Sequence, residues 1–197
     1  MRVLLVGDSQ GVGLTEPLRR LLRARGHELV WAKTEVGAPT SRAVAWVASA
    51  PPADLAFVVL GGNDGDLAVN NPTRYVTFIR QLVDALRTKA VRIVWIGPAH
   101  ATSPDVQARH DAARAVQLGA ISLMQGVQWI DGTALTADLP TGDSMGAHFA
   151  LPERTVWAER IMEQTFPRSN NVAILGGLAA ALTVAAFGFT VWLGRSA

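Results

Sequence analysis

The chain has 197 residues, of which 49% are hydrophobic and only 17% are charged, and its net charge is +2. Soluble domains usually carry about 25% charged residues, so we expect part of this chain to avoid water. The arginines are scattered and form no basic stripe, which argues against nucleic acid as a partner. The absence of cysteine excludes disulfides and thiolate metal sites.

Short apolar runs alternate along the chain with amphipathic stretches of helical periodicity. The predicted strands are residues 2–6, 28–32, 55–60, 91–96 and 127–130. The predicted helices are residues 15–25, 41–48, 73–88, 104–118 and 152–165, with Pro17 in the first turn of the first helix. Five short apolar strands separated by helices predict an α/β fold, in which a five-stranded parallel sheet is covered by helices on both faces.

The C-terminal segment, residues 172–193, contains no charged side chain. At a rise of about 1.5 Å per residue, a helix of this length spans the roughly 30 Å hydrocarbon core of a bilayer, so we predict a transmembrane helix there. Residues 1–167 would then form the globular domain and residues 168–171 a hinge. The alternative is a helix buried inside an assembly such as a viral particle.

The predicted membrane anchor has one arginine beyond each end, Arg168 and Arg195, so the positive-inside rule does not decide its orientation. The first apolar run of the chain is too short for a signal peptide. The simplest topology is a single-pass C-terminal anchor with the globular domain on the cytoplasmic side. Small residues recur every four positions at Gly177, Ala181 and Ala185, and this face could pair helices into a homo-oligomer.

The sequence GDSQGVG at residues 7–13 follows the first predicted strand. A phosphate-binding P-loop is excluded because it requires G-x-x-x-x-G-K-[ST], and no lysine precedes Lys33. The glycine spacing also departs from the G-x-G-x-x-G dinucleotide fingerprint. GDSQG matches the G-x-S-x-G elbow of α/β-hydrolases, but that fold has several strands before its elbow. What remains is Ser9, a serine beside a helix N-terminus that favours developing negative charge.

Polar residues and glycines follow four of the predicted strands, whose carboxyl ends meet at one edge of a parallel sheet. They are Ser9 after the first strand, Gly37 after the second, Gly61-Gly62-Asn63-Asp64 after the third and Gly97-Pro98-Ala99-His100 after the fourth. His100 and Asp64 are therefore candidates for a substrate pocket at this edge.

A serine hydroxyl needs a base within hydrogen-bond reach to act as a nucleophile. Of the four histidines, His27 lies in a predicted turn and His110 on a predicted helix, and we expect both at the solvated surface. His148 lies in a polar loop, TGDSMGAHF, directly before the last predicted helix. His100 and His148 therefore remain as candidates for a site at the sheet edge.

Four blocks of this sequence together resemble the SGNH hydrolases, the family of GDSL-like lipases and esterases. They are GDS after the first strand, Gly37 after the second, Gly61-Gly62-Asn63-Asp64 after the third, and Gly146-Ala147-His148-Phe149 before the closing helix. The match extends over residues 1–165, in order and at ordinary spacing. The resemblance implies a three-layer α/β/α fold of the flavodoxin type and a serine esterase activity that uses no metal and no other cofactor.

The resemblance also implies a role for each site residue. Ser9 would be the nucleophile that accepts the acyl group, and His148 would be the general base that then protonates the leaving alcohol. The backbone N–H groups of Ser9 and Gly37 and the side-chain amide of Asn63 would form the oxyanion hole.

The sequence departs from the family at the third member of the triad. The family usually places an acid three residues before the histidine, and this chain has Met145 at that position. Asp143 lies five residues before His148 and would reach the ring only if the loop bulges. Otherwise the enzyme would work with a dyad, in which backbone carbonyls hold the imidazole.

We therefore expect a carboxylic-ester hydrolase with an acyl-serine mechanism. No insertion is long enough to form a lid, which predicts an open, shallow site for short acyl groups, such as O-acetyl groups on glycans, or for lysolipids presented at a membrane. The alternative is a non-catalytic SGNH-like module that binds glycan or serves as a structural component, for example in a viral particle. Met145 favours this alternative, whereas Ser9, Asn63 and His148 argue against it. A phosphatase or nucleotide-binding function ranks third.

Overall fold

The structure of the protein is a computed structural model in which residues 1–143 and 146–167 are described. The predicted hinge, residues 168–171, and the predicted transmembrane helix, residues 172–193, lie outside the described residues. Among the helices of the described part, none is long and apolar enough to cross a bilayer. Residues Met1–Thr165 form one structural unit.

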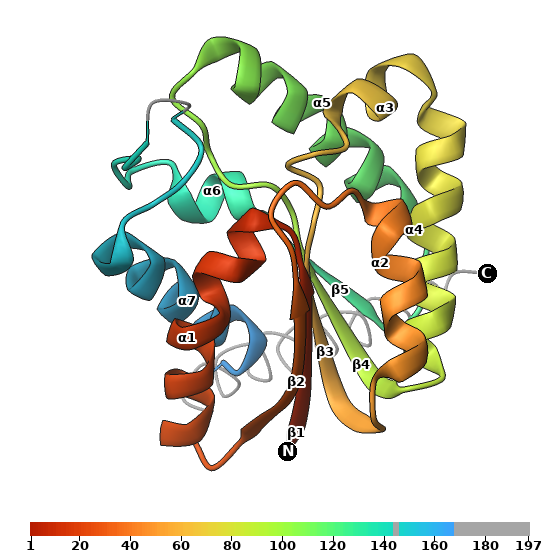
Figure 1. Ribbon diagram of the computed structural model, residues 1–197, viewed down its shortest axis with the longest axis vertical. Helices are drawn as coiled ribbons and strands as arrows, with labels where there is room; N and C mark the ends of the chain where they lie inside the picture. Colours follow the sequence, from red (N-terminus) through yellow and green to blue (C-terminus); the bar gives the residue numbers. More distant parts are fainter. Residues whose placement is uncertain (144–145, 168–197) are drawn as a thin grey trace, which may run out of the picture. The chain divides into compact units, whose positions relative to one another are not determined.

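Five parallel strands form the central sheet of this unit (Figure 1). They are β1 (Arg2–Gly7), β2 (Glu28–Thr34), β3 (Ala53–Val59), β4 (Ala90–Ile96) and β5 (Val127–Ile130). Their order across the sheet is β2-β1-β3-β4-β5, and each neighbouring pair is parallel. This is the strand order of flavodoxin-like folds, and it confirms the predicted α/β class with a five-stranded parallel sheet.

Helices cover both faces of the sheet. They are α1 (Ser9–Ala24), α2 (Thr40–Trp46), α3 (Gly65–Asn70), α4 (Pro72–Arg87), α5 (Pro104–Ile121), α6 (Gly132–Thr136) and α7 (Leu151–Thr165), with a single 3-10 turn, η1, at Val47–Ser49. Helices α1 and α7 pack together on one face, and α2, α4 and α5 pack side by side on the other (Figure 1). The predicted three-layer α/β/α arrangement is therefore confirmed.

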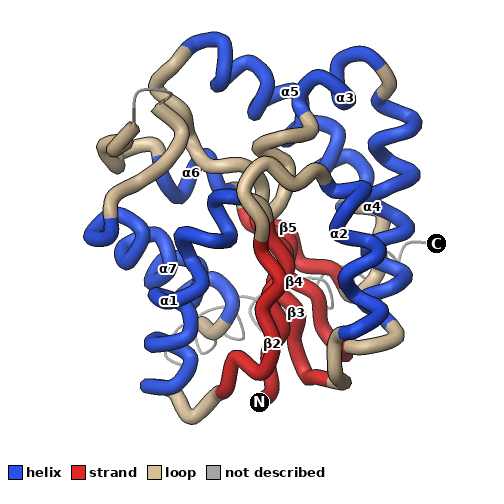
Figure 2. Tube along the Cα trace, in the orientation of Figure 1, coloured by secondary structure: helices blue, strands red, loops and turns tan. Residues whose placement is uncertain are grey.

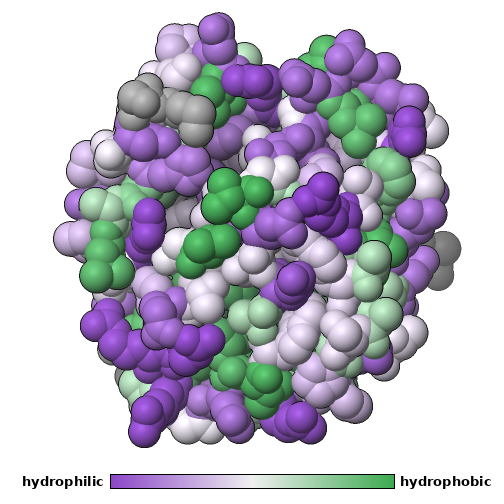
Figure 3. All heavy atoms as spheres, viewed as in Figure 1, coloured by the Kyte–Doolittle hydropathy of each residue, from purple (hydrophilic) through white to green (hydrophobic). Residues whose placement is uncertain are grey.

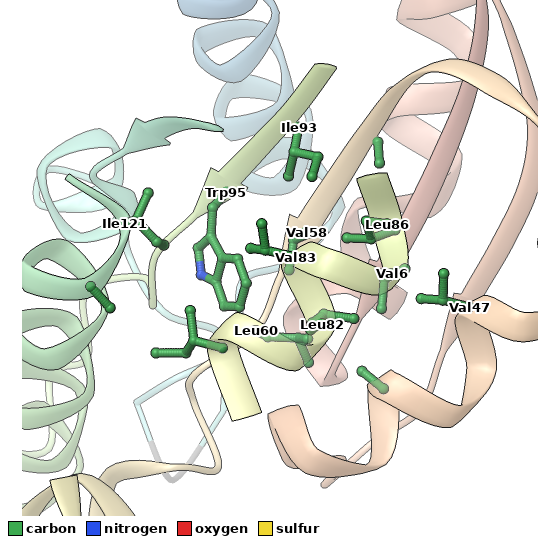
Figure 4. Packing of buried hydrophobic residues seen from close by; sticks show 14 of the residues in the cluster. Val6, Val47, Val58, Leu60, Leu82, Val83, Leu86, Ile93, Trp95 and Ile121 are labelled. Atoms are coloured by element: carbon green, nitrogen blue, oxygen red, sulfur yellow. The ribbon is translucent and has the colours of Figure 1, made fainter. Parts of the chain in front are cut away.

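The three central strands are enclosed between these helical layers. Every side chain from Val3 to Val6 and from Leu55 to Val59 is buried, which explains why these strands appear in the sequence as unbroken apolar runs. The edge strands β2 and β5 are mostly only partly buried. Figure 4 shows the indole of Trp95, from β4, inside the hydrophobic layer that α4 and α5 complete.

Helix α1 begins at Ser9, six residues before the predicted start at residue 15. The side chain of Asp8 accepts a hydrogen bond from the backbone N–H of Gln10, so the helix is capped directly at the end of β1. The prediction that Pro17 lies in the first turn was therefore wrong. Pro17 is buried inside the helix, where it has no N–H to donate to the carbonyl four residues earlier.

Two short helices, α3 and α6, were not predicted. Each is too short to show a repeating apolar face in the sequence. Helix α6 is held instead by a local cap, in which the side chain of Asp131 accepts a hydrogen bond from the backbone N–H of Ala134.

The loops that follow β1, β2, β3 and β4 gather at the carboxyl end of the sheet (Figure 2). The candidate residues that follow the strands lie here, whereas Asp143 and His148 lie in the loop between α6 and α7. On the face shown in Figure 3, hydrophobic residues form small groups separated by hydrophilic side chains. The large hydrophobic side chains exposed on the described surface come from separate elements, such as Val36 after β2, Val69 in α3 and Leu123 after α5.

Gly7 is expected to be essential for the close packing of α1 against the sheet. A Cβ atom at Gly7 would lie 2.7 Å from the Cα of Gly11 and 3.1 Å from the carbonyl oxygen of Val59. We predict that Gly7→Ala lowers the free energy of unfolding by about 1–3 kcal/mol, because the helix must move away from the strand. Urea unfolding of the full chain measures this change.

The matched control is Gly119→Ala in α5, where an added Cβ meets nothing within 4 Å. This variant should stabilise the protein by about 0.5–1 kcal/mol through helix propensity alone. Equal effects of the two substitutions would show that the close approach at Gly7 is unimportant.

Candidate active site

Ser9, His148 and Asp143 form a continuous chain of contacts at the carboxyl end of the sheet. Ser9 is the first residue of α1, and its Oγ lies 2.9 Å from Nε2 of His148. On the other side of the ring, Nδ1 of His148 lies 2.5 Å from Oδ2 of Asp143. Because a carboxylate accepts hydrogen bonds, Nδ1 carries the ring proton and Nε2 is left to accept the proton of the Ser9 hydroxyl.

The loop before α7 curls so that Asp143 reaches the ring despite its unusual spacing. The backbone N–H groups of Ala147 and His148 both donate to Oδ1 of Asp143, at 2.9 and 3.2 Å. Gly146 has a φ of +64°, a conformation that favours glycine, and its N–H donates to the carbonyl of Asp143. Of the two alternatives that the sequence left open, the structure thus has the bulged loop with Asp143 against His148.

The electrostatics of this loop keep Asp143 charged. Partial burial by itself would raise the pKa of Asp143, but the hydrogen bonds from the His148 ring and from the two backbone N–H groups outweigh it. The pKa of Asp143 therefore lies below its ordinary value, and the carboxylate is ionised at neutral pH.

A cavity of about 410 Å³ opens beside Ser9 and His148 and is also lined by Gly37 and Asn63. Gly37 has a φ of +77°, and Asn63 donates one N–H of its side chain to the carbonyl of Ala38 at 3.3 Å. The second N–H of that amide remains for a ligand. Within the described residues, no hydrogen bond uses the backbone N–H of Ser9 or of Gly37. Three candidate oxyanion donors thus belong to the walls of one cavity.

Two buried carboxylates hold the three loops that carry these donors. Asp8, directly before Ser9, accepts hydrogen bonds from the N–H groups of Gln10 at 2.9 Å and Gly62 at 3.2 Å. Asp64 accepts from the backbone N–H of Thr40 at 3.1 Å and from its hydroxyl at 2.6 Å. The first carboxylate ties the loop after β1 to the loop after β3, and the second ties the loop after β3 to the start of α2.

The prediction that Asp64 and His100 line a substrate pocket was wrong. Asp64 is buried and directed at Thr40, because its carboxylate needs donors once it is removed from water. The backbone N–H of His100 donates to the hydroxyl of Thr136 at 2.7 Å. Among the described residues, His100 does not line the cavity.

The prediction that His110 lies at the solvated surface was also wrong. Its side chain is only 2% exposed and lines the cavity with Ser9 and His148. Nδ1 of His110 donates to the carbonyl of Ala99 at 2.8 Å, and this contact turns the imidazole inward from α5. The weak amphipathic pattern of α5 gave no sign of which face is buried, so the sequence could not place this side chain.

No group of three or more Asp, Glu or His side chains in residues 1–143 and 146–167 is arranged to hold a metal ion.

No family model matches the sequence, and no match is found among curated proteins. Solved structures do match. An aryl esterase from M. smegmatis aligns with a TM-score of 0.63 at 18% identity, over 83% of this chain and 97% of the other. A member of the lipolytic G-D-S-L family from Veillonella parvula gives a TM-score of 0.66 at 16% identity, over 85% and 99%. Axe2, an acetylxylan esterase from Geobacillus stearothermophilus, gives 0.64 at 14% identity, over 85% and 94%.

These likenesses extend over nearly the full length of the solved structures and over 83–85% of this chain. The chain thus has the fold of the SGNH hydrolases, as the resemblance of its four sequence blocks predicted. At identities below 20%, the likeness establishes the fold, and the argument for an activity has to come from the site.

The pH dependence of stability should reveal the buried carboxyl of Asp8. Burial is the main cause that raises its pKa to about 7; the charge of Asp64 acts in the same direction, and the hydrogen bonds from Gln10 and Gly62 oppose it. Between pH 4 and pH 7, roughly, the unfolded chain loses this proton and the folded chain keeps it, so folding stability falls as pH rises.

We predict that the stability of the wild type relative to Asp8→Asn falls by at most about 1.4 kcal/mol per pH unit across this window and is constant at higher pH. Urea unfolding of both proteins from pH 4 to pH 9 measures the difference. A difference that increases with pH would contradict the raised pKa, because it would mean that the folded state favours the ionised carboxylate.

Proposed function

We propose that this protein is a serine carboxylic-ester hydrolase that works through an acyl-serine intermediate. The observation that carries the proposal is the chain of contacts from Ser9 through His148 to Asp143. In this arrangement a base activates a serine hydroxyl while a third group holds the base in the correct tautomer. The SGNH hydrolase fold, shared with solved esterases, supports the same proposal.

In the acylation step, Ser9 Oγ attacks the carbonyl carbon of the ester and its proton passes to Nε2 of His148. The negative charge that forms on the carbonyl oxygen is stabilised by the N–H groups of Ser9 and Gly37 and by the free N–H of Asn63. The positive charge that forms on His148 is stabilised by the ionised Asp143. When the tetrahedral intermediate collapses, the bond to the alcohol breaks and His148 returns the proton to the departing oxygen.

Deacylation repeats these steps with water. His148 accepts a proton from the water molecule, whose oxygen attacks the acyl carbon, and the bond to Ser9 Oγ breaks as the proton returns to the serine. Loss of one oxyanion donor typically costs about 10²–10³ in rate, so three donors fixed in one wall are a major part of the expected acceleration.

The proposed substrates are short-chain esters, such as O-acetylated glycans, or lysolipids. The cavity of about 410 Å³ is at the small end of the range for small-molecule sites, which is about 300–1,000 Å³, and this favours a short acyl group. Tethering to a membrane through residues 172–193, with the domain on the cytoplasmic side and helices paired into a homo-oligomer, stays a prediction from the sequence, since this segment lies outside the described residues.

The contact between Asp143 and His148 favours an enzyme over the non-catalytic binding module. That alternative depended on the absence of an acid at the usual position. With Asp143 within 2.5 Å of Nδ1, the imidazole has the acidic partner that a dyad would lack.

Hydrolysis of p-nitrophenyl esters from acetate to laurate by the full chain tests the proposed function. We predict turnover that is fastest on acetate and decreases toward laurate. Ser9→Ala should lower kcat by at least about 10⁴, because the nucleophile is lost while the oxyanion donors remain. Asp143→Asn should lower kcat by up to about 10⁴, because the amide neither fixes the tautomer of His148 nor balances its charge.

The matched control is Asp138→Asn. Asp138 is an exposed carboxylate that pairs with Arg160 on the surface and contacts none of the site residues, so this variant should keep the wild-type rate. A Ser9→Ala variant that keeps a rate close to that of the wild type, or a folded wild type with no activity on any ester, would overturn the proposed function.

A further inference from the structure

Two polar side chains in the cavity have no role in the mechanism proposed above. Gln10 and His110 both line the cavity beside Ser9 and His148, yet they are only 6% and 2% exposed. Burying an amide and an imidazole is costly unless their polar atoms find partners. Their placement against the reacting groups therefore suggests that a part of the substrate supplies those partners.

A single residue, Ala99, fixes the orientation of both side chains. The backbone N–H of Ala99 donates to Oε1 of Gln10 at 3.2 Å. The amide nitrogen of Gln10 is therefore the atom that is available to a ligand. The carbonyl of Ala99 accepts from Nδ1 of His110 at 2.8 Å, so the proton of the neutral ring is on Nδ1. Nε2 of Gln10 is thereby a hydrogen-bond donor, and Nε2 of His110 is a hydrogen-bond acceptor.

The two groups meet beside Gly62, the neighbour of Asn63. A Cβ atom at Gly62 would lie 3.5 Å from Nε2 of His110 and 4.0 Å from Cδ of Gln10. In the part of the chain that the structure describes, neither of the two Nε2 atoms has a protein hydrogen-bond partner. The result is a donor and an acceptor that both lie near Gly62 in the lining of one cavity, next to the candidate oxyanion hole.

The imidazole of His110 is held in its neutral, accepting form. Burial is the main cause that lowers its pKa, and the positive charge of Arg109 acts in the same direction, while the hydrogen bond to the carbonyl of Ala99 and the charge of Asp111 oppose it. With Nδ1 bound to that carbonyl, Nε2 of the neutral ring is a hydrogen-bond acceptor.

The rest of the described lining favours a polar ligand over a long acyl chain. The rim includes the charged side chains of Asp66 and Arg109, and among the described lining residues only Val106 and Ala147 have apolar side chains. Pockets for apolar ligands are lined predominantly by hydrophobic and aromatic side chains. A hydroxyl group both donates and accepts a hydrogen bond, so it fits a donor placed beside an acceptor.

We propose that Gln10 and His110 together bind a hydroxyl group on the alcohol part of the substrate, so that the protein prefers esters of polyhydroxylated alcohols, such as sugars, over simple alkyl esters. This inference rests on the proposed esterase function and names the substrate class for the same site. Once bound in the cavity, an alkyl ester would leave both nitrogens without a hydrogen-bond partner, which is the situation in which a polar site discriminates most strongly.

The test compares two acetate esters that differ only in their hydroxyl groups, glycerol monoacetate and n-propyl acetate. We expect the full-length wild type to have a kcat/KM at least about tenfold higher on glycerol monoacetate, since n-propyl acetate would leave polar groups of the site without a partner. In Gln10→Met and in His110→Phe, measured separately, this ratio should fall to near one, mainly through loss of activity on glycerol monoacetate.

Val106→Ala is the matched control, because it alters the same cavity wall without removing a polar atom and should keep the wild-type ratio. Thermal unfolding of each variant shows whether it is folded, and the two polar variants test the pair independently. A wild-type ratio near one, or a ratio unchanged in both folded variants, would overturn this inference while leaving the esterase intact. Absence of Ser9-dependent hydrolysis of both esters would overturn the proposed function itself and, with it, this inference.

Discussion

The site of this protein depends on two carboxylates that are buried at the carboxyl end of the sheet. Asp8 accepts backbone hydrogen bonds from the start of α1 and from Gly62, and Asp64 accepts the backbone and side-chain hydrogen bonds of Thr40. A carboxyl group removed from water needs such donors, and here the donors come from three different loops. The hydrogen bonds that these carboxyl groups accept thus also fix the relative positions of Ser9, Gly37 and Asn63.

Other residues of the site are likewise held in place by neighbours that do not face the cavity themselves. Ser9 and His148 meet across the gap between α1 and the loop before α7, and Asp143 fixes the ring within that loop. Ala99 has a similar effect on two other residues of the cavity, because its peptide group orients both Gln10 and His110. Rigid support of this kind keeps hydrogen-bond donors in place at the moment when charge develops, which is how preorganised sites stabilise a transition state.

Most of the fold and part of the site could be predicted from the sequence. Buried parallel strands appear as apolar runs, and Ser9, Gly37 and Asn63 follow the ends of such runs. Strand ends alone also indicated His100 and Asp64, which do not line the cavity. The resemblance of four sequence blocks to the SGNH hydrolases singled out Ser9, Gly37 and Asn63 and added His148, which precedes the last helix. Whether Asp143 reaches His148 depended on the conformation of the loop between them. The five-residue spacing in the sequence could not predict that conformation. The burial of His110 and the directions of Asp64 and Gln10 could not be predicted, because each follows from a partner that only the folded chain brings near, such as Ala99 for His110.

The central claim is that His148 and Asp143 make Ser9 an unusually reactive nucleophile. Covalent labelling tests it most directly: the full chain is incubated with a fluorophosphonate, and the adduct is located by mass spectrometry of the intact protein and its peptides. The account predicts a single adduct on Ser9, formed more slowly in Asp143→Asn and absent in Ser9→Ala. A folded wild-type chain that forms no adduct, or one that is labelled equally well after Ser9 is replaced, would contradict it.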